Sequence, residues 1–223
     1  KPLAPSVAEG KKLLRAAAKF DAPWLVGENF AFMDHVRQLQ IWIKKGRLGE
    51  IRVVEATQMT KMDQKNPYFG TSWRAKPKHI GGFVSDGGVH LANVVRRCFG
   101  MPSDICGFAA SFDPKLPPID TVMAALRFES GALGTWRSCF SAAYDGPMLR
   151  VYGSRGSAEL TWEKLTLCDH KGQETSVVNG RNSFVVQFQH FADVVLRGRA
   201  VEMTPDEALL DLQFLDALCR LAG

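Results

Sequence analysis

Several patterns that would decide a protein's class are absent from this sequence. No apolar run approaches the about eighteen residues that a membrane span needs, and the opening residues contain no apolar signal-peptide core. No G-x-G-x-x-G, P-loop or G-x-S-x-G pattern occurs, so we identify neither a phosphate-binding loop nor a serine nucleophile elbow. These absences favour a cytoplasmic protein that does not associate with membranes.

Cysteine is scarce and scattered. There are five cysteines, an odd number, and no C-x-x-C pair, which argues against a disulfide framework and a zinc ribbon. Most lie within apolar stretches, so we expect small buried thiols in a reducing compartment. The cysteines are Cys98, Cys106, Cys139, Cys168 and Cys219.

A concentrated basic surface is also missing, although the net charge is +5. The lysines and arginines are dispersed along the chain, whereas proteins that track phosphates concentrate them and interleave aromatic residues. A mildly basic solvated surface is therefore favoured over a nucleic-acid interface. Such a surface would also suit an anionic cofactor.

The periodicity of apolar residues predicts an α+β fold, with a mainly antiparallel open sheet flanked by helices. Short segments rich in β-formers are separated by turn signals after residue 105. The predicted strands cover residues 51–60, 105–111, 120–128, 132–140, 148–153, 157–162 and 164–169. The predicted helices cover residues 7–20, 34–45, 86–99 and 183–197, with a last one beginning at Pro205 behind the N-cap Thr204.

The first 29 residues have a different pattern. The helix at 7–20 begins with a capping box, Ser6 and Glu9, and leads through a tight turn to a short apolar strand at 24–26. That order is typical of the last αβ unit of a parallel sheet, which cannot form a sheet alone. Because the sequence also begins Lys1-Pro2 without a methionine, we expect it to be part of a longer protein.

Asp86 and His90 are the strongest candidates for chemistry. They lie four residues apart on a predicted helix, so their side chains share one face, and glycines at 81, 82, 87 and 88 would let backbone and ligand approach closely. A neutral histidine is a competent base near pH 7, and a nearby carboxylate can orient its ring. Spacing alone favours an Asp–His pair that merely supports the helix. A metal site is not predicted, because no third ligand stands at motif spacing.

The other histidines have no acidic or cysteine partner at motif spacing, so we interpret them as surface or structural residues. They are His35, His79, His170 and His190. Residues 61–80 are polar and aromatic without a clear period, which predicts an ordered loop over a site.

Three ordered motifs resemble the glucose–fructose oxidoreductase, inositol dehydrogenase and rhizopine-catabolism family (Gfo/Idh/MocA). Lys1-Pro2-Leu3-Ala4 is similar to the end of the family's E-K-P signature. The stretch from Gly81 to His90 resembles its G-G-x-x-x-D-x-G-x-H signature, and Gly46 to Ile51 resembles its turn into the first strand of the second domain. The resemblance covers the whole chain, and the G-G…D…G-x-H block is its most specific part.

This resemblance implies a division of the chain and an activity. Residues 1–29 would be the C-terminal remnant of an NAD(P)-binding Rossmann domain, and residues 30–223 a substrate-binding and oligomerisation domain. The implied activity is an NAD(P)-dependent dehydrogenase acting on CH–OH groups of a sugar, polyol or inositol-like substrate. A homo-oligomer formed through the sheet face is also implied, and the isolated portion is expected to be inactive.

The resemblance also implies residue roles. Lys1 would contact nicotinamide and the substrate hydroxyl, while Asp86 and His90 would bind substrate hydroxyls and move the proton. Cofactor contacts are implied for Lys1, Pro2, Asn29, Trp73 and Arg74, with NADP or NAD as the cofactor. Two departures stand out: no glycine-rich fingerprint is present, and Ala31 stands where the family often has arginine.

Two other functions remain open from the sequence. The chain could belong to a non-catalytic sensor or scaffold of the same fold, although a binding-only protein has no need of Lys1, Asp86 and His90 together. It could also be a module that assembles through its sheet, a use compatible with either function. Substrate, cofactor preference and reaction direction are not predicted.

Overall fold

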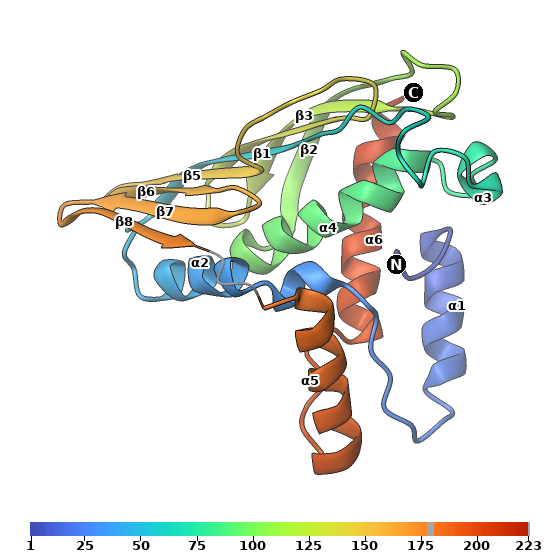
Figure 1. Ribbon diagram of the computed structural model, residues 1–223, viewed down its shortest axis with the longest axis horizontal. Coiled ribbons are helices and arrows are strands. Elements are labelled where there is room, and N and C mark those ends of the chain that lie inside the picture. The colour runs from blue at the N-terminus through green and yellow to red at the C-terminus, as the bar shows by residue number, and fades with distance from the viewer. Residues whose placement is uncertain (178–180, 223) are drawn as a thin grey trace.

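An eight-stranded sheet organises the chain, and helices pack against one of its faces (Figure 1). The computed structural model describes residues 1–177 and 181–222. The strands are β1 Ile51–Met59, β2 Pro102–Ala110, β3 Thr121–Phe128, β4 Leu133–Cys139, β5 Leu149–Gly153, β6 Gly156–Leu160, β7 Lys164–Asp169 and β8 Gly172–Val177. The helices are α1 Val7–Ala17, α2 Asp34–Lys44, α3 Ser72–Ala75, α4 Gly82–Phe99, α5 Ser183–Arg197 and α6 Pro205–Cys219, with 3-10 turns η1 Asn29–Phe32 and η2 Arg220–Ala222.

The strand order is β2-β3-β4-β1-β5-β6-β7-β8. Every neighbouring pair is antiparallel except β1 and β4, which run parallel at the centre of the sheet. Hairpin connections join β2 to β4 and β5 to β8 as two meanders, and the longest of them is the ten-residue segment between Ala110 and Thr121. The predicted α+β fold with a mainly antiparallel sheet is confirmed.

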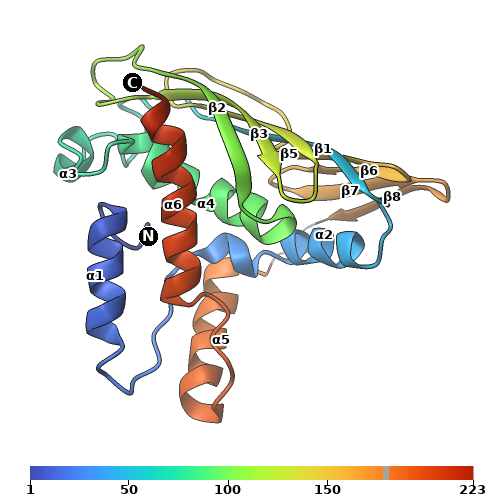
Figure 2. The same ribbon diagram turned by 180° about the vertical axis from the view of Figure 1, so that it is seen from behind.

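Alternating burial separates the two faces of the sheet. Along β3 the side chains of Val122, Ala124 and Leu126 are buried under the helices, while Met123 between them is exposed on the other face. Helices α2, α4 and α6 cover the buried face, and no described helix covers the opposite one (Figures 1 and 2). This places α4, which carries Asp86 and His90, at the centre of the helix layer, between α2 and α6.

Local capping sets the ends of two helices as the sequence predicts. The Ser6 side chain accepts a hydrogen bond from the Glu9 amide at the start of α1, and Thr204 accepts one from the Glu207 amide at the start of α6. Helix α1 then packs against α6 (Figure 2). At this contact Gly10 leaves room for Leu209.

Three elements differ from the sequence prediction. Helix α4 begins at Gly82 rather than at residue 86, because tertiary packing and not a side-chain cap starts it. Residues 61–80 contain the short helix α3. The polar segment Gly172–Val177, for which no strand was predicted, pairs with β7 as an edge strand.

The strand predicted at residues 24–26 is wrong. This segment is extended but is not in a sheet, and the Val26 amide donates instead to the Met203 carbonyl at 3.0 Å. A strand forms only beside another strand, and none of the described strands lies against this segment. Val26 packs with Phe32 and Met203 in a small second hydrophobic cluster.

The expected burial of the cysteines holds only in part. Cys139 and Cys219 are buried and Cys98 is half-buried, whereas Cys106 and Cys168 are exposed. The exposed pair lies on β2 and β7 and points away from the helices, so an apolar strand context did not guarantee burial. Burial raises the pKa of Cys98 and of Cys219 to about 12, which makes both thiols poor nucleophiles.

No helix in the described ranges has the length and apolar character needed to cross a bilayer.

Candidate active site

Asp86, in the second turn of α4, lies between two cations. The Lys1 ammonium donates to the Asp86 carbonyl oxygen at 2.5 Å and lies 3.5 Å from its carboxylate oxygen Oδ1. The Arg74 Nε donates to the other carboxylate oxygen, Oδ2, at 2.7 Å. The fold therefore brings together Lys1 at the start of the chain, Arg74 on α3 and Asp86 on α4.

His90 lies one turn after Asp86, but no hydrogen bond between these two side chains is present in the described structure. Its Nδ1 is 2.6 Å from the Glu28 carboxylate oxygen Oε1. The ring stacks on Phe30, with centroids 4.3 Å apart and planes 16° apart. The expectation that the neighbouring carboxylate Asp86 orients His90 is wrong, because Glu28 makes that contact and Asp86 is bonded to Lys1 and Arg74.

Glu28 was not singled out from the sequence. Its side chain is 1% exposed, and the same Oε1 also accepts a hydrogen bond from the Phe30 amide at the start of η1. The only local signal was a single carboxylate inside the otherwise largely apolar run from Trp24 to Phe32. A buried carboxylate in such a run needs a partner, and here the partner is 62 residues away in sequence.

The glycines around Asp86 do not serve the role expected of them. A Cβ on Gly87 would lie 2.6 Å from the Phe140 ring, and one on Gly88 would lie 3.1 Å from Leu215. A Cβ on Gly82, which has φ +48°, would lie 2.2 Å from the Pro117 carbonyl oxygen. These glycines let α4 pack closely against its neighbours within the protein, so the prediction that they make room for a ligand is wrong.

The proposed cofactor contacts lie in two places. The Arg74 guanidinium stacks over Trp73 at 3.9 Å and over Tyr68 at 4.7 Å, so it is held between these rings and Asp86. Trp73 itself is exposed. Asn29 is buried and donates from Nδ2 to the Ser183 hydroxyl at 2.9 Å, and Pro2 is half-buried beside Lys1.

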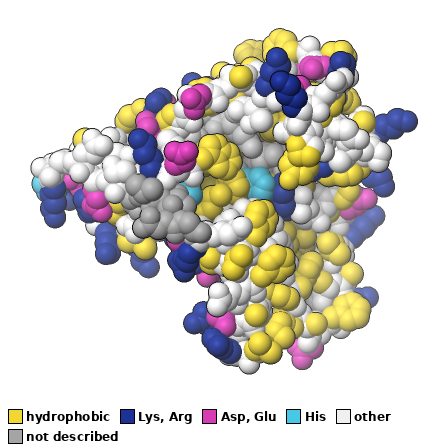
Figure 3. Space-filling model, viewed as in Figure 1, with side chains coloured by type: hydrophobic (Ala, Val, Ile, Leu, Met, Phe, Trp, Pro, Cys, Tyr) yellow, Lys and Arg dark blue, Asp and Glu magenta, His cyan; other side chains and the backbone are white. Residues whose placement is uncertain are grey.

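Two hollows flank the aromatic pair Phe30 and Trp162, whose rings meet edge to face at 5.4 Å. The larger, about 500 Å³, lies on the His90 side, and its wall includes Asn29 and Ser183. The smaller, about 60 Å³, includes Gln58 in its wall. Figure 3 shows the hollowed central surface, where hydrophobic and histidine side chains gather above the lobe formed by α5 and α1.

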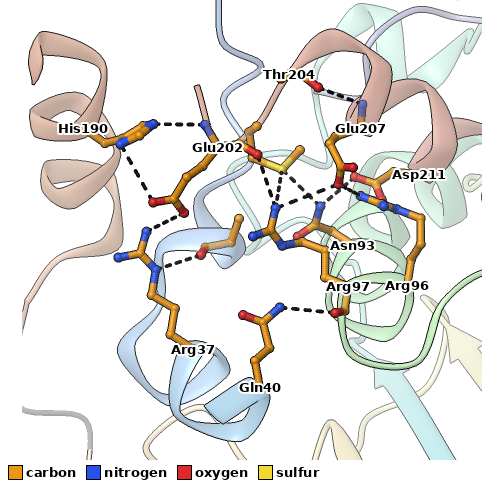
Figure 4. Close-up of polar contacts among 12 residues, drawn as sticks. Arg37, Gln40, Asn93, Arg96, Arg97, His190, Glu202, Thr204, Glu207 and Asp211 are labelled. Atoms are coloured by element: carbon orange, nitrogen blue, oxygen red, sulfur yellow. Dashed lines mark hydrogen bonds and ion pairs between the residues drawn. The ribbon is translucent and has the colours of Figure 1, made fainter. Parts of the chain in front are cut away.

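A second polar cluster holds the far end of α4 (Figure 4). Arg96 donates from Nε to Asp211 and from Nη2 to Glu207, each at 2.6 Å, and Asn93 donates to Asp211 at 2.7 Å. Burial raises the pKa of Asp211 to about 6 against the lowering effect of Arg96. The cluster ties α4 to α6 and so fixes the helix that carries Asp86 and His90.

His35 and His79 are both buried, in agreement with a structural role. The Gly81 amide donates to His79 Nδ1 at 3.0 Å, and the Ser85 hydroxyl contacts the same nitrogen. Burial lowers the pKa of both histidines, so each remains neutral under ordinary conditions. No cluster of three or more His, Cys, Asp or Glu suited to a metal ion occurs in the described part of the chain.

Residues 36–159 match the family model described as the GFO/IDH/MocA C-terminal domain. The matched segment is more than half of the chain. The chain belongs to the Gfo/Idh/MocA family. The crystal structure of an oxidoreductase from Thermotoga maritima supports this, with 31% identity, a TM-score of 0.93, and coverage of 100% of this chain and 68% of that one.

Other Gfo/Idh/MocA relatives are more distant. The dehydrogenase FPY6 of Fusarium mangiferae is 25% identical over 98% of this chain and 66% of its own length. An uncharacterized protein of Saccharomyces cerevisiae, YMR315W, is 28% identical over 70% of this chain and 45% of its own. Levoglucosan dehydrogenase, solved with NADH and levoglucosan, has the same fold with a TM-score of 0.86 at 19% identity. The chain thus spans about half to two thirds of the curated relatives it matches.

Proposed function

We propose that this chain is the substrate-binding portion of an NAD(P)-dependent oxidoreductase that acts on CH–OH groups of a sugar, polyol or inositol-like substrate. The observation that carries the proposal is that Lys1 contacts Asp86 one helical turn from His90, which borders the larger hollow, in a chain of the Gfo/Idh/MocA family. These residues come from the start of the chain and from two turns of α4, and no stability argument requires a lysine, a carboxylate and a histidine to lie so near one another.

The three side chains have complementary roles in this proposal. His90 accepts the proton of the substrate hydroxyl, since its Nε2 makes no hydrogen bond in the described structure and the ring borders the larger hollow. Lys1, held by Asp86, donates a hydrogen bond to the substrate oxygen and stabilises negative charge that develops there. Asp86 fixes the lysine and offers its carboxylate to neighbouring hydroxyls.

The donor set fits the nicotinamide end of NADP or NAD, and the sequence contains no glycine-rich phosphate loop. Lys1, Pro2 and Asn29 would hold the ring and ribose, while the exposed indole of Trp73, with Arg74 stacked on it, offers a flat cationic surface. The cofactor supplies hydride acceptance when bound. Two structural relatives were solved with NAD+ or NADH, which supports this choice.

The walls of the hollow support a polyhydroxylated substrate. Trp162 is 56% exposed and Phe30 lies edge-on to it, so the pair presents apolar surface on which a sugar ring can stack. Asn29, Asp34 and Ser183 around it offer hydrogen bonds to hydroxyl groups. A relative solved with levoglucosan binds a compound of this class.

We further propose that residues 1–29 belong to the nucleotide-binding domain and residues 30–223 to the second domain. Because the chain has no phosphate-binding loop, the portion alone is expected to be inactive. Free cysteines support a reducing, cytoplasmic compartment.

The open face of the sheet supports a homo-oligomer. Large apolar side chains are exposed along it beside arginine–glutamate pairs, and a second copy would bury them. These side chains are Val53, Phe108, Met123, Leu133 and Tyr152. Phe108→Asp combined with Met123→Asp should give a monomer by light scattering; an unchanged mass would contradict this interface.

The test of the activity uses the longer protein that contains this chain. Purified with NAD+ or NADP+, it should oxidise at least one member of a panel of sugars, inositols and polyols, and Lys1→Met should abolish that activity. A control, Lys11→Met, changes an exposed lysine on α1 and should leave it intact. Nucleotide binding without turnover across the panel would instead support the sensor function.

A further inference from the structure

We infer that Glu28 is the positioning residue for His90: its buried carboxylate holds the imidazole with the hydrogen on Nδ1, leaving Nε2 as the base. The inference rests on the proposed function for its kinetic consequence, but its structural part stands without it. In this arrangement the site contains two separate acid–base pairs, Lys1 with Asp86 and His90 with Glu28.

Glu28 is buried and lies within hydrogen-bond distance of His90. Glu28 Oε1 lies 2.6 Å from His90 Nδ1, and the Glu28 side chain is 1% exposed. Oε1 also accepts from the Phe30 amide, while Oε2 has no partner among the described residues. No lysine or arginine in the described ranges forms an ion pair with Glu28, and His90 is the ionisable side chain to which it is hydrogen-bonded.

The Glu28 carboxylate determines which ring nitrogen of His90 carries the hydrogen. An ionised carboxylate only accepts hydrogen bonds, so the nitrogen that faces it must bear the hydrogen. A neutral His90 is therefore held in the Nδ1–H form, and Nε2 keeps its lone pair. When Nε2 takes the hydroxyl proton, the imidazolium that forms already faces a buried negative charge, which stabilises it.

The surroundings fix the ring in this orientation. Phe30 stacks on the imidazole, and its own amide is bonded to Glu28, so one turn of η1 supplies both the stacking ring and the aligned carboxylate. Asp86 is already held by Lys1 and Arg74. The two carboxylates thus have different tasks: Asp86 holds the lysine, and Glu28 holds the histidine.

A nitrogen-15 correlation spectrum of the histidine rings tests the inference without substrate or cofactor. His79 is an internal reference of the opposite kind, because the Gly81 amide donates to its Nδ1 and the hydrogen must be on Nε2. In the wild type, His90 should show the Nδ1–H form and His79 the Nε2–H form. A His90 found in the Nε2–H form would overturn the inference outright, whether or not any variant folds.

The variant Glu28→Gln keeps the side-chain shape and removes the charge. It should shift His90 away from a pure Nδ1–H form while leaving His79 unchanged. The matched control is Glu202→Gln, a carboxylate near His190 that has no contact with His90, and it should leave both signals in place. An unchanged His90 spectrum in Glu28→Gln would mean that Glu28 does not set the ring.

Kinetics of the longer enzyme separate the two proposals. Glu28→Gln should lower kcat by about 100-fold or more with KM within about threefold, because the base is misoriented while the substrate walls remain. An unaffected kcat in an active enzyme would sink the positioning role. No turnover on any substrate, together with the expected histidine spectra, would contradict the proposed function and leave the Glu28–His90 pair standing.

Discussion

Helix α4 carries one polar cluster near each end, and the two clusters are built differently. Towards its C-terminal end, Asn93 and Arg96 meet Asp211 and Glu207 in a buried, directly bonded network (Figure 4). Near its start, Asp86 is held by Lys1 and Arg74, and His90 borders a hollow, where its Nε2 has no hydrogen bond within the described structure.

The difference separates stability from chemistry. A charged pair that is buried with its partners resists change, since removing one partner leaves an uncompensated charge. A pair at the edge of a hollow keeps a nitrogen or an ammonium available for another molecule. The same helix therefore uses one end as an anchor and the other as a reactive surface.

The largest expected effect is on activity at the start of α4. His90→Ala in the longer enzyme should lower kcat/KM by about 100- to 10,000-fold, which is what loss of a general base costs. Thermal stability should also fall, because the variant leaves the buried Glu28 carboxylate without its histidine partner, so activities are compared at a temperature at which both proteins are folded. Comparable activity in the variant and the wild type across the substrate panel would contradict the assignment.

At the other end of α4 the effect should be on stability. Asp211→Ala should lower the free energy of unfolding by roughly 3 kcal/mol, because Arg96 then retains only Glu207 in a buried setting. Urea denaturation measures this directly. At urea concentrations below the unfolding transition of Asp211→Ala, the nitrogen-15 spectrum of His90 should be unchanged. A shifted His90 signal would show that the two ends of α4 are not independent.

On the face of α4 that packs towards the sheet, a substitution should change stability only through the volume of the new side chain. Gly87→Ala should cost about 1–3 kcal/mol, since a Cβ would lie 2.6 Å from the Phe140 ring in a closely packed layer. The double variant Gly87→Ala with Phe140→Leu should recover part of that loss if crowding is the cause. Equal stability of wild type and the single variant would refute it.

The smallest effect concerns pH. Burial lowers the pKa of His35 in the folded chain below its ordinary value of about 6.5. Between these two pKa values the unfolded chain binds a proton at His35 and the folded chain does not. The His35 contribution to stability should therefore fall as pH drops below about 6.5. Asp211, whose pKa is raised, contributes in the opposite direction near pH 6.

Comparison of two variants isolates the histidine contribution. His35→Leu keeps a similar volume and removes the titrating group, so its unfolding free energy should decline less between pH 7.5 and pH 5.5 than that of the wild type. Asp211 is present in both and cancels. Identical pH slopes would show that His35 titrates alike in the folded and unfolded chains.

Features set by neighbouring residues were predictable from the sequence. The caps at Ser6 and Thr204 are correct because a capping side chain bonds to an amide three residues away. The antiparallel strands from residue 102 to 169 follow from alternation and turn signals, and their ends shift by only a few residues.

Features set by distant partners were not predictable. Glu28 and His90 are linked only through the fold, and no spacing rule connects them. Helix α4 starts four residues early, at Gly82, which packs against Pro117 and Pro118. The glycines near Asp86 were correctly seen as places of close approach, but what approaches is Phe140 and not a ligand.

The position of β1 has a consequence for the order of folding. Each meander closes through hairpins, whereas β1 must pair Val53 with Leu133 and Val54 with Val151, partners contributed by both meanders. Contacts of such long sequence separation form slowly. We therefore expect the two meanders to gain protection from hydrogen exchange early in refolding and the β1 amides late, so that insertion of the central strand is the step that limits the rate.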